Sequence, residues 1–374
     1  MNTMAMSRIV WICLLVILVS GCTPAEQSTG SPSSTQESQK VYHWKLVTTW
    51  PKNLPGLGTG PEKMVKNIEV MSQGRLKIKV YGAGELVPAF GVFDAVSEGT
   101  AEMGHGAAYY WRGKLPVAAM FATVPFGLNA QEMNGWLHYG GGLELWQELY
   151  APFGIHPLAG GNSGVQMAGW FNKEINSLAD IKGLKMRIPG LGGEVFQRAG
   201  GVAVAMPGGE VFTALQTGAI DATEWVGPYN DLALGLHTIA KYYYYPGWHE
   251  PGPTLETLVN KASFESLPED LQAIVTSASR AMNADMLDEF TARNNASLQT
   301  LIKEHGVVLR RLPDDVLARF SELSKAVVKE NAQADDLSRR IYDSYTDFLD
   351  DMIEYEKVSE QAYLNARSEA AAAH

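Results

Sequence analysis

The segments KMRIPG (residues 185–190) and DATEWVGP (residues 221–228) each read as an apolar strand that runs into a turn. The first places Arg187 near its end, and the second places Glu224 beside Trp225. The planar guanidinium group of arginine suits a carboxylate that is held by two parallel hydrogen bonds. An acid near that arginine would either pair with it directly or hold a cation. Both alternatives predict a site for a small anionic ligand at the ends of strands.

Five motifs in this region carry a resemblance to a known family. They are QMAGWF (166–171), GLKMR (183–187), GGEVFTALQ (208–216), GAIDATEW (218–225) and EWVGPYN (224–230). They resemble motifs of the extracytoplasmic solute receptors of TRAP transporters (tripartite ATP-independent periplasmic transporters). Within that family, QMAGWF and EWVGPYN are similar to the branch that binds 2-oxoacids and lactate. The similarity covers roughly residues 43–365, with the motifs in family order.

The length and the charge of the chain limit the classes of protein that fit it. With 374 residues the chain is long enough for two domains. Its formal net charge of −11 makes nucleic acid and anionic lipid headgroups poor partners. The same charge repels a carboxylate ligand, so an anion site in this protein must be locally positive.

The first residues read as a targeting segment. Arg8 precedes an apolar run at residues 9–19 that is too short to span a bilayer, so residues 1–21 are expected to be a signal peptide. The run ends in LVSGC (residues 18–22), which resembles the lipobox of bacterial lipoproteins. Lipidation would explain why Cys22 is a lone cysteine in an exported protein. The alternative is an ordinary cleaved signal followed by an incidental cysteine.

Residues 22–40 are expected to form a lipid anchor followed by a flexible tether. From residue 23 to residue 40 the chain is mainly Ser, Thr, Gln, Pro and Gly, a composition that cannot bury a core. The predicted location is therefore the periplasm or cell envelope, with the folded body held at a membrane by its lipid.

The folded body is expected to be an α/β structure. Strands at 41–49, 75–81 and 101–106 with helices at 62–72 and 90–98 between them imply a largely parallel sheet. A helix at 133–150 leads into strands at 154–158, 165–171, 184–188 and 219–225, and residues 253–260 return as a strand of the first sheet. From Pro268 onward the chain is expected to be almost continuously helical.

Together with the resemblance, this order implies a two-lobed, periplasmic-binding-protein-like fold with crossing segments. Lobe I would take residues 41–162 and about 247–290, and lobe II residues 163–246 and about 291–333. Residues 334–374 would form a C-terminal helical extension with an apolar stripe at helical spacing. That stripe fits a helix packed on its own lobe or one docked on a second copy, as in dimeric members of the similar branch. Its residues are Ile341, Tyr345, Phe348, Leu349, Ile353 and Tyr363.

The resemblance also implies roles for single residues around the solute. Arg187 would clamp the carboxylate of the solute, and lysine should not replace it because a point charge cannot make a planar two-point contact. Asn162 and Tyr109 would add hydrogen bonds. Three aromatic residues would wall the pocket, although an aromatic side chain is more often part of a core. They are Trp50, Phe171 and Trp225.

A cation is expected beside the solute. In the similar branch the glutamine at the position of Gln166 offers its carbonyl oxygen to a cation, and Glu224 and the carbonyl of Trp225 would add oxygens. Glu250, in GWHEPG (247–252), stands where the family often carries glutamine. An all-oxygen set suits Na⁺ or Ca²⁺ rather than zinc, and a second carboxylate favours a divalent ion, so the choice between the two stays open.

The sequence favours a receptor over an enzyme. It contains no phosphate loop, dinucleotide fingerprint, nucleophile elbow or zinc helix, so no organic cofactor is expected. His249 is interpreted as a satisfied loop histidine. The predicted function is the binding of a small 2-oxo or 2-hydroxy monocarboxylate with a hard cation, for delivery to a membrane permease. One rival is a cation-dependent enzyme that acts on a 2-oxoacid, and another is an anchored structural lipoprotein without a small-molecule pocket.

Overall fold

The computed structural model describes residues 40–372. The expected signal peptide (1–21), the lipidation site Cys22 and nearly all of the tether lie outside the described residues. Within the described part, no helix combines the length and the apolar character needed to cross a bilayer.

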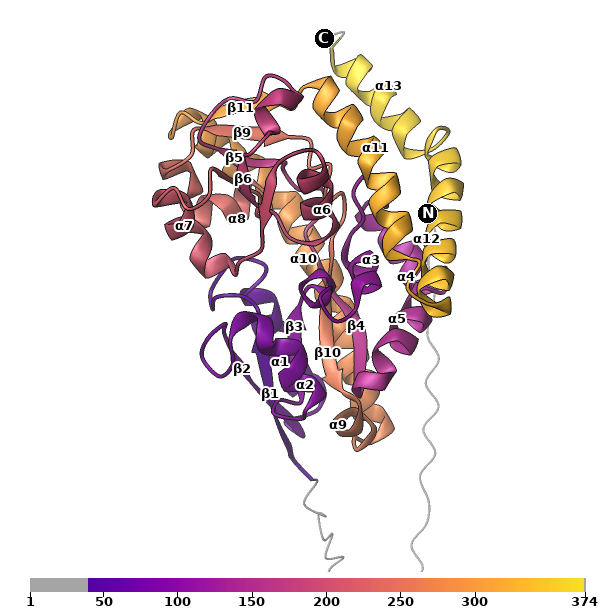
Figure 1. Cartoon of the computed structure of the whole chain (residues 1–374). Coiled ribbons are helices and arrows are strands. Elements are labelled where there is room, and N and C mark those ends of the chain that lie inside the picture. Colours follow the sequence, from indigo (N-terminus) through magenta and orange to yellow (C-terminus); the bar gives the residue numbers. More distant parts are fainter. Residues whose placement is uncertain (1–39, 373–374) are drawn as a thin grey trace, which may run out of the picture. The chain divides into compact units, whose positions relative to one another are not determined.

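A five-stranded sheet carries the first half of the fold (Figure 1), in the order β2-β1-β3-β10-β4. β1 is parallel to β2 and β3, as the βαβ rhythm predicts. β10 lies between β3 and β4 and is antiparallel to both, which confirms the returning strand but makes the sheet mixed. The direction is reversed because β4 leads away to the second sheet and β10 comes back from it. The strands are β1 (Tyr42–Thr48), β2 (Leu76–Tyr81), β3 (Met103–Gly106), β4 (Ile155–Asn162) and β10 (Thr254–Asn260).

The second sheet has six short strands in the order β11-β9-β5-β8-β6-β7. β6 lies between β7 and β8 and is parallel to both, while β5 is antiparallel to β8 and β9. The strands expected at 165–171 and 219–225 shrink to three and two residues, because the rest of each segment has irregular backbone. The strands are β5 (Gly169–Phe171), β6 (Lys185–Arg187), β7 (Val202–Val204), β8 (Ala222–Thr223), β9 (Tyr242–Tyr245) and β11 (Val308–Arg311).

Helices pack on both sheets. α10 is the longest, and it contacts α1 and β4 beside the first sheet and α8 beside the second. The helices are α1 (Thr59–Met71), α2 (Val92–Ser97), α3 (Ala119–Ala122), α4 (Ala130–Tyr139), α5 (Gly142–Tyr150), α6 (Gly190–Arg198), α7 (Gly208–Gln216), α8 (Pro228–Ala233), α9 (Lys261–Glu265), α10 (Glu269–Lys303), α11 (Asp314–Asn331), α12 (Asp336–Glu356) and α13 (Glu360–Ala372).

Two of the helical expectations are wrong in detail. The helix expected at 133–150 is divided into α4 and α5, because Gly141 has a left-handed backbone (φ +83°) that favours glycine. The helical C-terminal region is interrupted by β11, which pairs in parallel with β9. The chain turns into this strand at Gly306, whose φ is +64°.

Two crossing segments connect the sheets and lie against each other. Residues 163–168 lead from β4 to β5, and residues 246–253 lead from β9 back to β10. The backbone N–H of Gln166 donates to the carbonyl of Glu250 (3.1 Å). A β-carbon on Gly247 would meet the Gln166 carbonyl oxygen at 2.0 Å, so this approach requires glycine. The crossing therefore holds Gln166 and Glu250 side by side.

The C-terminal helices extend over α4 and α5. α12 contacts both helices, and its Ile341 and Tyr345 are buried there. The Tyr345 hydroxyl accepts a hydrogen bond from the N–H of Leu128 (2.9 Å). Farther along the predicted stripe, Ile353 and Tyr363 are exposed. The first half of the stripe thus covers the protein's own helices.

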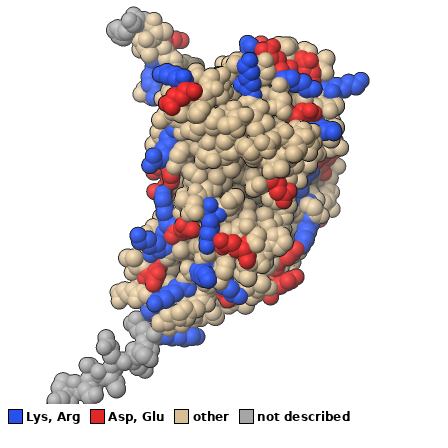
Figure 2. All heavy atoms as spheres, turned by 90° about the vertical axis from the view of Figure 1, so that its left-hand side faces the viewer, with Lys and Arg blue, Asp and Glu red and all other residues tan. Residues whose placement is uncertain are grey.

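The face seen in Figure 2 carries charges of both signs. Lys and Arg lie among Asp and Glu at the top and across the lower half of the face, and the upper middle has few charged side chains. On this face the charge is mixed rather than concentrated in one basic or acidic field.

Candidate functional site

Arg187 ends β6 and its side chain is buried, with 1% of the residue exposed. Its Nη1 pairs with the carboxylate of Glu224, and its Nε donates to the carbonyl of Met206 (3.2 Å). The guanidinium carbon lies 5.0 Å from the centre of the Trp225 ring, a cation–π geometry. Nη2 donates to the hydroxyl of Tyr110 through a long hydrogen bond (3.4 Å). Arg187 is thus a buried cation with a carboxylate on one side and aromatic groups around it.

Glu224 follows β8, the strand next to β6, and is fully buried. Its N–H donates to the carbonyl of Arg187 (3.1 Å), so the sheet itself brings the acid and the arginine together. One carboxylate oxygen pairs with Arg187, whereas Oε2 has no hydrogen-bond partner among the described residues. Burying an oxygen of this kind without a partner is unfavourable.

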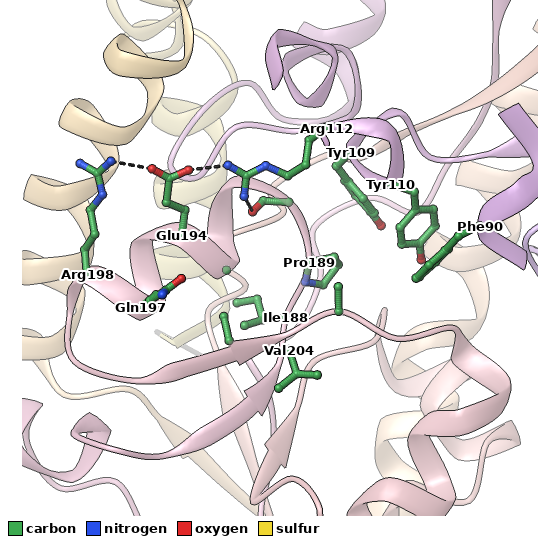
Figure 3. A pocket seen from close by; sticks show the side chains of 14 residues that line it. Phe90, Tyr109, Tyr110, Arg112, Ile188, Pro189, Glu194, Gln197, Arg198 and Val204 are labelled. Carbon is green, nitrogen blue, oxygen red and sulfur yellow. Dashed lines mark hydrogen bonds and ion pairs between the residues drawn. The ribbon is translucent and has the colours of Figure 1, made fainter. Parts of the chain in front are cut away.

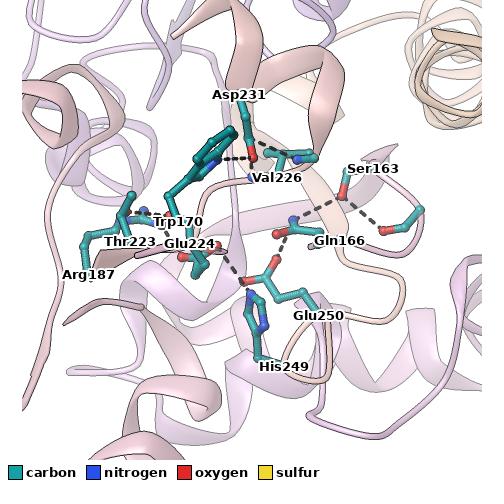
Figure 4. A network of polar contacts seen from close by, with 12 residues as sticks. Ser163, Gln166, Trp170, Arg187, Thr223, Glu224, Val226, Asp231, His249 and Glu250 are labelled. Carbon is teal, nitrogen blue, oxygen red and sulfur yellow. Dashed lines mark hydrogen bonds and ion pairs between the residues drawn. The ribbon is translucent and has the colours of Figure 1, made fainter. Parts of the chain in front are cut away.

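Gln166 and Glu250 meet on the crossing segments (Figure 4). Nε2 of Gln166 donates to Glu250 Oε2 (2.8 Å) and to the hydroxyl of Ser163 (3.2 Å). With its amide nitrogen engaged in this way, the buried Oε1 of Gln166 has no partner among the described residues. Burial raises the pKa of Glu250 well above its ordinary value, and the negative charge of Glu224 adds to that rise.

These acids form a compact group with His249. One ligand atom each from Glu224, His249 and Glu250 can be chosen so that all three lie within 4.8 Å of one another. His249 Nε2 lies 3.5 Å from Glu224 Oε2, yet neither ring nitrogen has a hydrogen-bond partner within residues 40–372. The interpretation of His249 as a satisfied loop histidine is therefore wrong. When Glu224 and Glu250 are both ionised, their two negative charges exceed the single positive charge of Arg187. A cation would balance the excess and would favour the ionised form of Glu250 against its raised pKa.

Asp231, in α8, holds the segment that follows Glu224. One of its oxygens accepts from the N–H groups of Val226 and Gly227 (both 3.1 Å). The other accepts from Nε1 of Trp170 (2.9 Å) and from the hydroxyl of Tyr243 (2.6 Å). Burial raises the pKa of Asp231 to about 6, although these donors oppose the rise. Asp231 is not among the residues predicted from the sequence, but an acid in the first turn of a helix that begins with Pro228 is a usable signal.

A small void lies beside Arg187 and Gln166. Its volume is about 10 Å³, hardly enough for one water. A larger pocket of about 650 Å³ adjoins it and shares Tyr109 and Tyr110 with it (Figure 3). The void is lined by Trp50, Leu57, Tyr109, Tyr110, Ser163, Gln166, Arg187, Trp225, Val226 and Leu255.

Trp50 is fixed in the wall of the void by a buried histidine. Its Nε1 donates to Nδ1 of His105 (2.8 Å), and Nε2 of His105 donates to the carbonyl of Gly160 (2.8 Å). Burial lowers the pKa of His105 to about 4, so this side chain is neutral at physiological pH. The Trp50 ring then meets the Trp225 ring edge-on, with centroids 6.3 Å apart.

The family model of the bacterial extracellular solute-binding proteins, family 7, matches residues 46–335. The chain belongs to this family. A monocarboxylate 2-oxoacid-binding periplasmic protein from Nostoc sp. (strain PCC 7120) is 44% identical over 336 residues, which cover 90% of this chain and 92% of that relative.

Two solved structures of TRAP periplasmic solute-binding proteins are similar to this family member. One, from Colwellia psychrerythraea with bound calcium and pyruvate, is 43% identical with a TM-score of 0.85 and covers 87% of this chain and 100% of that one. The other, from Pseudoalteromonas atlantica T6c with bound sodium and pyruvate, is 42% identical with a TM-score of 0.84 and covers 87% and 99%. The protein is thus a solute receptor of the TRAP type, with the expected two-lobed α/β fold and long helical C-terminus.

In this receptor the predicted site residues do not all come together. Asn162 donates to the carbonyl of Gly252 (3.1 Å) and accepts from the N–H of Gly164 (2.8 Å), so it secures the start of a crossing segment. Phe171 packs edge-on against Tyr244, with centroids 5.0 Å apart. Neither residue lines the void or the adjoining pocket. For these two residues the geometry favours structural roles, whereas the other predicted residues surround the void or adjoin Glu224.

Proposed function

We propose that this receptor binds a small 2-oxo or 2-hydroxy monocarboxylate together with a hard cation and passes the solute to a TRAP membrane permease. One observation carries the proposal: a buried arginine adjoins two buried carboxylates and an amide whose oxygens are not all hydrogen-bonded. An anion alone would be repelled by Glu224 and Glu250, and a cation alone would be repelled by Arg187. A cation and a carboxylate that bind together satisfy both groups.

The cation would take oxygens from Gln166, Glu224, Glu250 and the backbone carbonyl of Trp225. The unpartnered Oε1 of Gln166 and Oε2 of Glu224 support this assignment, because buried oxygens without donors are typical ligands of hard cations. His249 lies beside the set, but its nitrogens are poor ligands for Na⁺ or Ca²⁺. Relatives at nearly equal identity hold either calcium or sodium with pyruvate. Both ions therefore stay in the proposal.

Arg187 would hold the carboxylate of the solute, with Tyr109, Trp50 and Trp225 around it. The void of about 10 Å³ is too small for a three-carbon acid. Binding therefore requires the surrounding side chains or the two lobes to move apart and then close. The lobes that we propose are residues 41–162 with about 247–290, and residues 163–246 with about 291–333, joined by the crossing segments.

The panel that tests this function is a set of calorimetric titrations with pyruvate, lactate, 2-oxobutanoate and acetate. We expect the 2-oxo and 2-hydroxy acids to bind and acetate to bind far more weakly, because acetate has no oxygen on carbon 2 that could join its carboxylate in binding the cation. Equal binding of acetate, or no binding by any acid of the panel, would contradict the proposal.

We infer that the protein is a receptor and not an enzyme, as its family membership supports. The rival is a cation-dependent enzyme that acts on a 2-oxoacid. Incubation of pyruvate with a stoichiometric amount of protein and the cation, followed by NMR, separates the two functions. A receptor returns pyruvate unchanged, whereas any protein-dependent product supports the enzyme.

A lipid anchor at Cys22 and a signal peptide at residues 1–21 remain part of the proposal. The support is LVSGC at residues 18–22 and the tether composition that follows it. Intact-mass analysis of protein from the membrane fraction should show added acyl mass on a chain that begins at Cys22. A soluble mature chain without that mass would contradict the anchor.

The C-terminal helices leave two oligomeric states in the proposal. The first part of α12 packs on α4 and α5 of the same chain. Beyond it, apolar side chains such as Ile353, Tyr355 and Tyr363 are exposed, and a second copy would cover them. A monomer with a surface helix is the alternative. Light scattering of the purified receptor distinguishes one copy from two.

A further inference from the structure

Two tyrosines stand between the void and the outer pocket. Tyr109 and Tyr110, from the short 3₁₀ helix at Ala108–Trp111, line both spaces. Tyr109 is buried and packs closely on Gly190: a β-carbon added to Gly190 would lie 3.2 Å from the β-carbon of Tyr109. Tyr110 is half-buried, so its side chain can move or be replaced with less disturbance than that of Tyr109.

The Tyr110 side chain is supported on both sides of this partition. Its hydroxyl reaches Arg187 (3.4 Å), the proposed carboxylate clamp. On the outer side its ring lies 4.7 Å from the ring of Phe90, and on the inner side it lies 6.0 Å from that of Trp50 (centroid distances). The ring therefore stands directly between the group that would hold the acid and the outer pocket.

The outer pocket is lined with groups that suit an alkyl chain. Ile188 and Val204 lie at its floor, and Phe90 and Tyr110 lie at its side (Figure 3). The pocket volume of about 650 Å³ exceeds what a short alkyl tail needs.

The charged rim of the same pocket argues against a second carboxylate on the tail. Arg112 pairs with Glu194, and Arg198 lies 2.5 Å from the other oxygen of Glu194. Both guanidinium groups are thus already paired with Glu194, and Arg198 also pairs with Glu330 (2.6 Å). An apolar tail loses nothing at this rim, whereas a second carboxylate would have to compete with Glu194 for its partners.

We propose that Tyr110 sets the length of the solute: with its ring in place the receptor accepts the shortest 2-oxo monocarboxylates, and without the ring the void joins the outer pocket and longer unbranched 2-oxo monocarboxylates bind. This proposal rests on the proposed function, because it assumes that Arg187 holds the carboxylate. The tail of a longer acid then runs past position 110 toward Ile188 and Val204.

The test is a calorimetric series with pyruvate, 2-oxobutanoate, 2-oxopentanoate and 2-oxohexanoate in one cation-containing buffer. The proteins are the wild type, Tyr110→Phe and Tyr110→Ala. Tyr110→Phe keeps the ring and removes only the hydroxyl, so it is the matched control for the contact with Arg187. We expect affinity to fall with length in the wild type and in Tyr110→Phe. In Tyr110→Ala we expect affinity to rise by up to about fourfold for each added methylene.

Parallel length profiles in the wild type and in Tyr110→Ala would overturn the proposal, and so would loss of every acid by a folded Tyr110→Ala protein. If circular dichroism shows that this variant does not fold, Phe90→Ala decides, because it removes the outer support of the ring and should flatten the profile. An unchanged profile in Phe90→Ala would then overturn the proposal. If the wild type binds no acid of the series, the proposed function fails and the length limit fails with it; if only the profiles coincide, the length limit alone is wrong.

Discussion

In the proposed complex Arg187 binds two anions, the carboxylate of Glu224 and the carboxylate of the solute. Its three nitrogens are therefore divided between protein groups and the solute. Nη1 is taken by Glu224 and Nε by the carbonyl of Met206, while Nη2 makes only a long contact with Tyr110. A solute carboxylate would therefore approach Nη2 without displacing the buried pair. Breaking that pair would be expensive, because it would leave a buried charge without compensation.

Arg187→Lys is expected to weaken pyruvate binding by roughly a hundredfold, since one charge-assisted hydrogen bond contributes about 1.5–3 kcal/mol. Lysine keeps the charge but cannot serve Glu224, Met206 and the solute at once. Calorimetry measures the affinity, and circular dichroism checks that the variant is folded. Arg340→Lys, at an exposed pair with Glu148, is the control and should bind normally. Near-normal affinity in the Arg187 variant would remove this residue from the site.

Glu250→Gln is expected to weaken pyruvate binding in calcium buffer more than in sodium buffer. The substitution keeps a side-chain oxygen but removes one negative charge from the cluster with Glu224, and charge count matters more for a divalent ion. Titrations of pyruvate in calcium buffer and in sodium buffer measure both effects. An equal loss in the two buffers would mean that Glu250 contributes shape rather than charge.

Glu256, on β10, gives the first lobe a stability that depends on pH. It is fully buried and accepts hydrogen bonds from Trp111 and Tyr150, and burial raises its pKa to about 8. An unfolded glutamate has a pKa of about 4.3. The folded protein thus holds a proton that the unfolded chain releases between these values, so stability is full below pH 4.3 and falls as the pH rises toward 8.

Glu256→Gln is therefore expected to remove a decline of up to about 1.4 kcal/mol per pH unit from unfolding measured between pH 5 and pH 8. Glutamine can still accept from Trp111 and donate to Tyr150. Denaturant unfolding at several pH values measures the slope. Glu148→Gln, at an exposed acid, should leave the slope unchanged. If the slope of Glu256→Gln equals that of the wild type, Glu256 is ionised in the fold.

Single residues differ in how far the sequence reveals them. Arg187 and Glu224 stand out because charged residues are rare at the ends of apolar strands. His249 was interpreted as a satisfied loop histidine and Tyr110 was not among the predicted site residues. Both approach the site only when the crossing segment and the helix at 108–111 are folded. Asn162 stays a solute ligand implied by the resemblance, although both ends of its amide bond to backbone groups of the crossing segments.

Among the helices, α7 is placed by the absence of one side-chain carbon. A β-carbon on Gly208, the first residue of α7, would lie 2.1 Å from the Trp225 ring. Gly208 therefore allows the helix to approach the indole that walls the void. The next residue, Gly209, has only Pro51 within 4 Å of such a carbon, at 3.9 Å.

Gly208→Ala is expected to destabilise the fold by about 1–3 kcal/mol, the usual range for an overpacked contact, and to weaken pyruvate binding because Trp225 must shift. Gly209→Ala is a matched control in the same turn of the same helix and should leave binding unchanged. Thermal unfolding and calorimetry of the two variants make the comparison. Equal effects of the two substitutions would show that helix propensity, and not contact with Trp225, explains the glycine.

The strands and helices could be predicted where the hydrophobic period extends over many residues. The prediction failed where an element has only two or three residues. Strands β1, β2 and β3 and helix α1 agree with the expected segments within a few residues. β7 was missed and β8 was expected to be several residues longer, since two or three residues carry no readable period. The division of the expected 133–150 helix depends on Gly141, whose positive φ is not visible in a helical pattern.

Over the full chain, the site depends on the passage of the polypeptide between the two sheets. Gln166 and Glu250 come from segments that cross in opposite directions, and Arg187 and Glu224 come from adjacent strands of the second sheet. In the lobe division that we propose, no single lobe contains the complete set. The family motifs predict which residues to examine, but only the crossing of the two segments shows that Gln166 lies against Glu250 and that Glu250 lies beside Glu224. The net charge of −11 makes a bound cation the simplest way for this protein to attract a carboxylate.

The most direct measurement is a titration of the receptor with pyruvate after exhaustive chelation in sodium-free buffer, followed by the same titration with Na⁺ or Ca²⁺ added separately at matched ionic strength. We expect the affinity to fall by about a hundredfold or more without the cation and to be restored by at least one of the two ions, because screening by salt acts weakly on buried charges. Unchanged affinity in all three buffers would contradict the account: it would mean that the buried acids pair with protein groups alone and that the solute binds without a cation.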